Sequence, residues 1–394
     1  MSNRAVLLLS VAALASAASV RAADPLLPLL GAEFGVSAGT ASIVITAFGI
    51  SYGLLQVVFA PLSDRFGKYR IVCITTLVSA IGTLACALAP SLEWLTIARF
   101  AAGATVGAII PLSMAWIGDT VRYDERQAVL ARFLLGQIAG VAVGQMAAGI
   151  IGEYFGWRWL FVLLSILYAV TGALLLAESR RNAATRQVPP EAPRGVKEGF
   201  VRMGGLLRRP KVRRVLLTIT PEGMLMYGAL SFVPAHLQLH FGVSPGVAGS
   251  IAAFVAVGGA TYAFSARHFI AALGERGLAL GGGAALGTGF MLLALAPMAW
   301  VAAIGLMFAG CGYYMLHNTL QTHATQMAPE ARGAALALFA LTFFSAQSLG
   351  VWLGAKVVDN YGAPPLFAIS SVGLFVLGLM FSRQTRKSQA GAGK

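Results

Sequence analysis

The sequence predicts an all-α membrane protein with twelve transmembrane helices in two pseudo-symmetric six-helix bundles. Three observations lead to this fold class. The 394 residues are 57% hydrophobic and 11% charged, with a mean hydropathy of +0.75, whereas soluble domains are about 45–50% apolar and about 25% charged. Apolar runs close to the ~20 residues that cross ~30 Å of hydrocarbon recur along the chain. A pair of sequence markers is repeated at a nearly constant offset.

The apolar runs give the predicted helices in order. Backbone amides inside a bilayer have no water to bond to, so spanning segments are expected to be helical. Six helices precede a polar stretch and six follow it, at residues 4–30, 40–61, 70–90, 92–117, 127–151, 157–177, 214–238, 246–268, 277–297, 299–325, 333–357 and 364–382. The predicted units are an N-terminal bundle (1–178), a cytoplasmic linker (179–213) and a C-terminal bundle with a short cytoplasmic tail (214–394).

Basic residues are unevenly distributed over the predicted loops. The formal net charge is +14, but Lys and Arg cluster between apolar runs rather than along a face with interleaved aromatics, which argues against nucleic acid as a partner. Nearly all of them fall on one side, and the positive-inside rule makes this side cytoplasmic, together with both termini. We expect a multi-pass protein of the bacterial inner (plasma) membrane, in contact with lipid and monomeric.

The strongest organisational feature is an internal repeat. Residues 34–39 (F-G-V-S-A-G) recur as 241–246 (F-G-V-S-P-G), 207 positions later, and 154–156 (Y-F-G) are echoed by 360–362 (N-Y-G), 206 positions later. One marker follows the first helix of each half and the other precedes its last helix, which predicts a duplication. The first 23 residues also imitate a cleaved secretory signal peptide. The repeat argues against that alternative, because it requires the first helix as the counterpart of the seventh.

The loop between the second and third predicted helices contains a specific motif. Residues 60–70 read A-P-L-S-D-R-F-G-K-Y-R, which resembles the signature loop G-x-L-x-D-R-x-G-R-[KR] of the major facilitator superfamily. Ala60 and Lys68 stand where that family has glycine and arginine. With the helix count, the central loop and the repeat, the resemblance covers the whole chain. It implies the major facilitator fold and a transporter with its site between the two halves.

The resemblance also implies a gating function, because in this family the loop latches the cytoplasmic side when the transporter faces outward. Gly67 is expected to permit a tight turn. A loop after the fourth predicted helix, Asp124-Glu125-Arg126, is similar to a second loop of the family. The residues assigned to gating are Asp64, Arg65, Gly67, Lys68 and Arg126. The alternative is an ordinary charged loop beside a membrane helix.

Ionisable groups inside predicted helices support the functional prediction, because such groups are costly in a bilayer unless paired or hydrated. Of fifteen acidic residues, only Asp24 and Glu222 lie inside predicted helices away from their ends. Arg21 and Asp24 are three residues apart, so they share a helix face and can pair. A carboxyl group removed from water holds a proton more readily, as a reversible proton carrier requires. A structural ion pair, or for Glu222 a pairing with Arg214, is the alternative.

Further resemblances link these charges to proton coupling. Asp24, followed four residues later by Pro28, resembles the first helix of the drug:proton antiporter branch. Arg99 resembles the arginine of the family's R-x-x-x-G motif in helix 4, which is implicated in proton transfer, although Ala102 replaces the usual glutamine. The antiporter motif of helix 5 fits only in part, since Val141 stands where proline belongs. This departure leaves the direction of transport open.

Polar and aromatic residues predict a substrate cavity. His317 and Gln321 lie one helical turn apart, and such groups line a cavity because facing lipid would be costly. Hydrogen bonding between helices without a substrate is the alternative. The predicted cavity residues are Tyr227, Tyr313, Tyr314, His317, Asn318, Gln321, Gln137 and Gln347.

The sequence therefore predicts a proton-coupled secondary transporter that works by alternating access and exports small amphipathic molecules. Asp24 and Glu222 exchange protons, Arg21 and Arg99 tune them, and the proton gradient supplies energy without a cofactor. No nucleophile, metal cluster or cofactor loop is visible in the sequence, so an enzyme is not expected. The alternatives are uptake or exchange of small organic anions bound through Arg21, and a membrane sensor or scaffold that does not transport.

Overall fold

The computed structural model describes residues 3–186 and 203–392, and among these residues it contains helices and no strand. Part of the predicted linker, residues 187–202, lies outside the described residues. The elements are α1 (Asn3–Arg21), η1 (Asp24–Leu26), α2 (Leu27–Phe34), α3 (Ala38–Ala41), α4 (Ile43–Phe66), α5 (Lys68–Ala87), α6 (Leu92–Val106), α7 (Ile109–Thr120), α8 (Tyr123–Tyr154), α9 (Trp157–Arg181), η2 (Ala183–Arg186), α11 (Pro210–Leu230), α12 (Val233–Phe241), α13 (Pro245–Ala252), α14 (Phe254–Leu295), α15 (Val301–Gln326), η3 (Pro329–Ala331), α16 (Arg332–Tyr361) and α17 (Ala363–Ala392).

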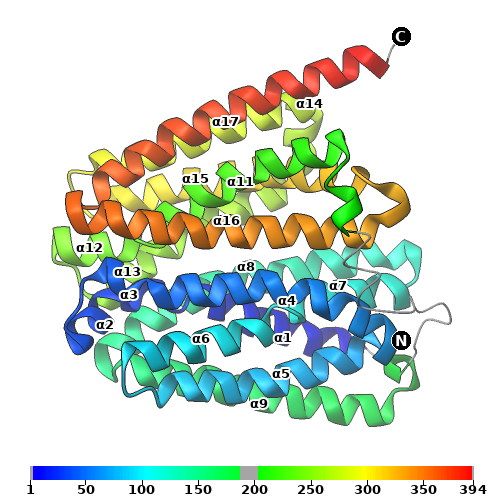
Figure 1. Cartoon of the computed structure of the whole chain (residues 1–394), viewed down its shortest axis with the longest axis horizontal. Helices are drawn as coiled ribbons and strands as arrows, with labels where there is room; N and C mark the ends of the chain where they lie inside the picture. The colour runs from blue at the N-terminus through cyan, green and yellow to red at the C-terminus, as the bar shows by residue number, and fades with distance from the viewer. Residues whose placement is uncertain (1–2, 187–202, 393–394) are drawn as a thin grey trace.

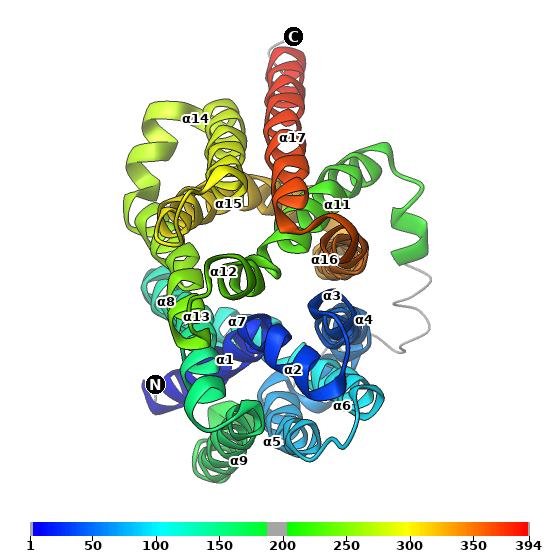
Figure 2. The ribbon, with the colours of Figure 1, turned by 90° about the vertical axis from the view of Figure 1, so that its left-hand side faces the viewer.

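The helices run roughly along one axis and form two groups. Helices α1 to α9 lie in the lower part of Figure 1, and α11, α12 and α14 to α17 lie in the upper part. Figure 2 looks along the helices and shows the same separation, with α13 reaching across to α8. The groups also meet where α16 packs on α3 and α4. The two ends of the chain lie at the same end of the molecule, on the right in Figure 1.

Within residues 3–186 and 203–392, ten segments are long and apolar enough to cross a membrane. One of them, Pro245–Leu295, covers 51 residues and contains two of the predicted spans. A straight helix of that length would measure about 75 Å, but this one turns at Gly274, whose φ is +59°. The predicted helix 299–325 forms as α15, which is rich in polar side chains and is not among the ten. All-helical membrane architecture is confirmed, and the count of twelve spans stays a prediction.

The first helix of each group is interrupted. The predicted span 4–30 lies within one apolar segment, Arg4–Phe34, but α1 gives way there to a short 3₁₀ turn that begins at Asp24. Pro25 and Pro28 lack an amide hydrogen and clash with the preceding turn, which explains the interruption. In the other group, α11 ends just before Ser231 and α12 begins with Pro234 in its first turn. Ser231 follows Asp24 by 207 positions, so the two breaks occupy equivalent places in the repeat.

Glycines at four-residue spacing bring α8 close to α1. A Cβ added at Gly140 would lie 2.5 Å from the carbonyl oxygen of Leu14, and one added at Gly144 would lie 2.6 Å from the Cα of Ala18. Such backbone approach is possible only without a side chain, as in small-residue interfaces of membrane helices. The glycine series therefore allows close packing of α8 on α1, which holds the first helix inside the bundle.

The substitution Gly144→Ala tests this packing against Gly118→Ala as a matched control. An added methyl at Gly118 would meet no atom within 4 Å. We expect Gly144→Ala to lower the melting temperature in detergent, because overpacking typically costs about 1–3 kcal/mol. Gly118→Ala should be neutral or slightly stabilising, since alanine favours the helix by about 1 kcal/mol. Equal melting temperatures for the two variants would contradict the packing described for α1 and α8.

Candidate functional site

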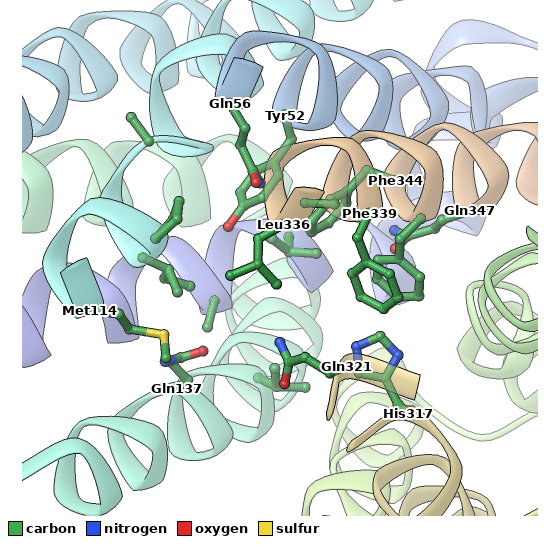
Figure 3. Close-up of a pocket in the computed structure, with 18 of the residues that line it drawn as sticks. Tyr52, Gln56, Met114, Gln137, His317, Gln321, Leu336, Phe339, Phe344 and Gln347 are labelled. Atoms are coloured by element: carbon green, nitrogen blue, oxygen red, sulfur yellow. The ribbon is translucent and has the colours of Figure 1, made fainter. Parts of the chain in front are cut away.

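A cavity of about 730 Å³ lies between the two groups of helices. It extends from Arg21 to Ser63, Lys68 and Gly333, toward the end of the molecule that holds both termini. Among the residues that line it are Tyr227, Tyr313, Tyr314, His317, Gln321, Gln137 and Gln347, all expected there from the sequence. Figure 3 shows side chains from α4, α8, α15 and α16 around the cavity. The wall is mostly aromatic and aliphatic, with amide groups placed on several helices.

Asn318 is a correction to the predicted cavity set. Its side chain hydrogen-bonds Tyr262 of α14, and the cavity wall is formed by its neighbour His317 instead. Successive residues on a helix point about 100° apart, and here Asn318 points toward α14 while His317 points toward the cavity. For Asn318, the alternative of hydrogen bonding between helices describes the structure.

Arg21 and Asp24 form a buried ion pair at the break after α1. Their side chains are 2% and 0% exposed, and Arg21 Nη1 lies 3.0 Å from Asp24 Oδ2. The same nitrogen donates to Ser231 Oγ at 3.1 Å, and the guanidinium lies 4.1 Å above the ring of Tyr227. Within the described residues, Arg21 Nη2 and Asp24 Oδ1 have no hydrogen-bond partner. The predicted pairing is confirmed, and its arginine also contacts the other group of helices.

Glu222 forms a second buried pair, with a partner that the sequence did not suggest. Its Oε2 lies 2.9 Å from His317 Nδ1, and the glutamate side chain is fully buried. The partner considered from the sequence, Arg214, is wrong, because His317 of α15 occupies that position. Glu222 Oε1 finds no hydrogen-bond partner in the described part of the chain. The histidine lines the cavity, so it separates the glutamate from the open space.

A line of aromatic rings joins the two pairs. Arg21 stacks on Tyr227, whose ring centroid lies 5.5 Å from that of Tyr313. The hydroxyls of these tyrosines share a hydrogen bond. Tyr313 in turn stacks on His317 at 4.8 Å, with the rings inclined by 25°. A continuous run of contacting side chains thus connects the two pairs along one wall of the cavity.

Arg99 is buried but lies away from this line. Its Nη1 and Nη2 donate to the carbonyl oxygen of Ser19 at 3.3 Å, and its Nε donates to that of Val44 at 3.4 Å. The guanidinium also lies 3.9 Å above the ring of Phe48. These bonds tie α6 to the backbones of α1 and α4. Among the described residues Arg99 shows no hydrogen bond or ion pair with Asp24, but its charge acts on that carboxyl group through space, so its tuning role stays a prediction.

The predicted gating loop forms a tight turn between α4 and α5. Gly67 has a φ of +91°, which a residue without a Cβ adopts readily. The next residue, Lys68, pairs with Asp119 near the end of α7 and lines the outer part of the cavity. Because Asp119 is 54% exposed, this ion pair is at the water-accessible end of the site.

The remaining gating residues are dispersed around that turn. Arg65 is exposed, with its guanidinium 5.2 Å from the ring of Phe66. Arg126, at the start of α8, donates from Nε and Nη2 to the carbonyl oxygen of Val121 at 3.3 and 3.1 Å. Asp64 belongs to α4, but its side chain lies outside the described residues.

The comparisons with known proteins agree with this architecture. The family model described as Major Facilitator Superfamily matches residues 9–351 and 222–393. The chain belongs to the major facilitator superfamily. It is 26% identical over 364 residues to the uncharacterized MFS-type transporter YwfA of Bacillus subtilis (strain 168), a match that covers 91% of this chain and 86% of that protein.

Shorter matches connect this major facilitator protein to drug resistance and efflux proteins. The lincomycin resistance protein of Streptomyces lincolnensis is 28% identical over 185 residues, covering 47% of this chain and 38% of that protein. The efflux pump FUB11 of Gibberella moniliformis is 30% identical over 166 residues, covering 42% and 28% of the two chains. The resemblance on which the family prediction rested is confirmed.

Solved structures show the same fold at low identity. A POT family transporter in complex with 5-aminolevulinic acid superposes with a TM-score of 0.78 at 15% identity, covering 97% of this chain and 96% of that one. The xylose transporter XylE from E. coli gives 0.72 at 14% identity, covering 96% and 97%. These superpositions show the fold of this major facilitator protein.

At the end of the molecule opposite the two termini, two related contacts join the two groups of helices. Asp359, near the end of α16, accepts from Ser37 Oγ at 2.7 Å and from the Gly39 amide at 3.1 Å. Glu153, near the end of α8, accepts from the Gly246 amide at 2.9 Å. Gly246 follows Gly39 by 207 positions, and Asp359 follows Glu153 by 206 positions. A carboxylate at a helix N-terminus is stabilised by the exposed amides there, so each contact links one group to the other.

The repeated sequence marker has a physical explanation in these contacts. Its first glycines, Gly35 and Gly242, have φ values of +66° and +65°, which end the preceding helix. Its serines, Ser37 and Ser244, accept a hydrogen bond from the backbone amide three residues later and so cap the next helix. The sequence showed the marker but not its carboxylate partners, because these lie more than 90 residues away.

Because the pair of Arg21 and Asp24 is buried, we expect removal of one partner to cost more stability than removal of both. Removing one member of a buried ion pair costs about 3–5 kcal/mol because it leaves an uncompensated buried charge, and removing the second charge as well relieves that penalty. We expect Arg21→Gln to lower the melting temperature markedly and the double variant R21Q/D24N to recover most of the loss. Arg158→Gln is the control, because its pair with Glu33 is 41% and 38% exposed and should contribute at most about 1 kcal/mol. Equal losses in R21Q and R158Q would contradict the assignment.

Proposed function

We propose that this protein is a proton-coupled secondary active transporter that exports small amphipathic molecules by alternating access. The observation that supports this most strongly is the pair of buried carboxylates, Asp24 and Glu222, each with one basic partner beside the same cavity. In the interior of a membrane protein such groups mark ion and substrate pathways. We further propose an inner-membrane monomer with both termini in the cytoplasm, which needs a proton gradient and no cofactor.

The cavity wall favours amphipathic substrates. Aromatic side chains such as Phe339 and Phe344 provide apolar surface, while Gln137, Gln321 and Gln347 offer amide donors and acceptors. This combination suits a ring-containing molecule with a few polar groups. Export as the direction is supported by similarity to efflux pumps and to a lincomycin resistance protein.

Alternating access is supported by a difference between the two ends of the molecule, since one end is held together by contacts and the cavity extends toward the other. The carboxylate contacts of Asp359 and Glu153 join the groups of helices at one end, while the cavity extends toward Lys68 and Gly333 at the other. With the termini in the cytoplasm, this arrangement is the inward-facing state. Release of substrate on the far side then requires both contacts to break.

Transport of organic anions is the second candidate, and one observation favours it. Arg21 lines the cavity, and its Nη2 lacks a hydrogen-bond partner in the described part of the chain. An anionic substrate would bond to this nitrogen. Competition of transport by anionic rather than cationic compounds would select this candidate. The pairing of Arg21 with Asp24 already neutralises the guanidinium, which is why we favour the first proposal.

Proton coupling is tested in proteoliposomes with an imposed pH gradient, using ethidium and lincomycin as probes. We expect the wild type to accumulate probe against its concentration gradient. Asp24→Asn and Glu222→Gln should lose this accumulation, because a neutral amide cannot bind and release a proton, yet should retain exchange without a pH gradient. Glu275→Gln is the control, since Glu275 pairs with His323 away from the cavity. Full gradient-driven transport by both D24N and E222Q would show that the proton role is wrong.

The contacts of Asp359 and Glu153 are tested by the distance between spin labels on Thr40 and Tyr361. These two residues are exposed on opposite sides of the contact between Asp359 and Gly39. We expect the double variant D359N/E153Q to populate a longer distance, because a neutral acceptor is held less strongly by backbone amides. Each ~1.4 kcal/mol of lost stabilisation shifts the populations about tenfold. Gly39→Ala should act similarly, since its Cβ would lie 2.3 Å from Asp359 Oδ1. An unchanged distance distribution in both variants would exclude these contacts as a gate.

A further inference from the structure

His317 lies between the buried Glu222 carboxylate and the open cavity. Among the described residues, it is the one side chain that hydrogen-bonds this carboxylate. Its Nδ1 is taken by Glu222 Oε2 at 2.9 Å, and its ring lines the cavity. The ring centroid of Tyr313 lies 4.8 Å from that of His317. The ring centroid of Phe343, on the adjacent helix α16, lies 4.9 Å from that of His317. These contacts fix the plane of the ring. The second nitrogen, Nε2, is therefore the atom that the pair presents to a molecule in the cavity (Figure 3).

The number of protons on the Glu222–His317 pair determines whether Nε2 donates or accepts a hydrogen bond. With a single proton shared between the two side chains, this proton lies on Nδ1 and points at the Glu222 carboxylate, because the other tautomer would place two lone pairs 2.9 Å apart. Nε2 then has a free lone pair and accepts hydrogen bonds. When a second proton reaches the pair from the cavity and binds at Nε2, this nitrogen has an N–H. This holds whether the inner proton stays on Nδ1 or moves to Glu222.

We propose that His317 Nε2 is the hydrogen-bond switch through which proton and substrate exclude each other. The proposal rests on the proton-coupled transport inferred above. In the singly protonated pair, Nε2 accepts from a donor group of the substrate, such as an ammonium or a hydroxyl attached to an aromatic ring system. When a proton from water binds the Nε2 lone pair, a new N–H bond forms and the acceptor is lost. The substrate donor then has no partner at this atom and leaves.

The inner proton moves without any further reactant. As Nε2 gains its proton, the Nδ1–H bond can break and an O–H bond can form on Glu222 Oε2, which leaves a neutral glutamic acid beside a neutral imidazole. The pair has then gained one proton in total. If the departing substrate is a monovalent cation, the exchange at this site is electrically neutral. The proposed substrate class is therefore an aromatic molecule with a protonated amine or a hydroxyl near its ring.

The groups around the pair do not replace Glu222 in this function. Tyr227 of α11 and Tyr313 of α15 face it with neutral hydroxyls that bond to each other. From α16, the side chains in contact with the ring are Phe339 and Phe343, which do not ionise. On the other group of helices, Arg21 and Asp24 lie beyond Tyr227 and neutralise each other.

The protonation of His317 can be measured directly by nitrogen NMR of the full-length protein in lipid bilayers, with ¹⁵N-labelled histidine. The chain has five histidines, and the signals of His317 are those absent from H317Q. At high pH we expect Nδ1 to bear the proton and Nε2 to be unprotonated, and Nε2 should gain a proton as the pH falls. In Glu222→Leu the high-pH tautomer should reverse, because nothing then holds the proton on Nδ1. A protonated Nε2 at high pH in the wild type, or an unchanged tautomer in E222L, would overturn the proposal.

Transport then separates this proposal from the function on which it rests. In the proteoliposome assay, His317→Gln should retain exchange of the probe but lose gradient-driven accumulation, since glutamine fills the site without binding a proton. His323→Gln is the matched control on the same helix, because its pair with Glu275 lies away from the cavity, and it should behave as wild type. Gradient-driven accumulation by H317Q would overturn the switch while proton coupling stands. No gradient-driven transport by the wild type, with the NMR switch present, would instead refute the proposed function alone.

Discussion

The energetic penalty for a charge in a low-dielectric interior is the constraint on which the rest of this structure depends. Asp24 and Glu222 are fully buried, and a carboxylate in such a place must be paired, hydrogen-bonded or protonated. Asp24 meets this requirement at the break of the first helix, where Arg21 reaches it and at the same time reaches Ser231. Glu222 meets it through a histidine that also lines the cavity. Both pairs thus lie beside the cavity between the two groups of helices, which Arg21 and His317 line.

The scaffold is duplicated, whereas the buried chemistry is not. Both halves repeat the left-handed glycine, the serine cap and the carboxylate that closes one end. At the equivalent places of the repeat, however, Asp24 corresponds to Ser231 and Glu222 to Ala15. Arg21 bonds to both Asp24 and its counterpart Ser231. In the proposed transport cycle the symmetric frame opens and closes as a whole, while the asymmetric side chains would give its two states different affinities for protons and substrate.

The sequence was sufficient for the features that depend on local pattern. Hydropathy located the helices, the repeat indicated the duplication, and three-residue spacing predicted the pair of Arg21 with Asp24. Contacts between distant segments could not be predicted in this way. The partner of Glu222 is His317, 95 positions away, and the aromatic line through Tyr227 and Tyr313 depends on how two helices pack. For the same reason Asn318 was assigned to the cavity, although a rotation of one residue directs it to α14.

The central claim is that the two buried carboxyl groups change their protonation within the folded protein. Infrared difference spectroscopy between acidic and neutral pH tests this without any substrate, because a protonated carboxyl group has its own C=O stretching band. The account predicts such a band in the wild type, a weaker band in each of D24N and E222Q, and none from these groups in the double variant. A difference spectrum that is the same in the wild type and the double variant would contradict the account.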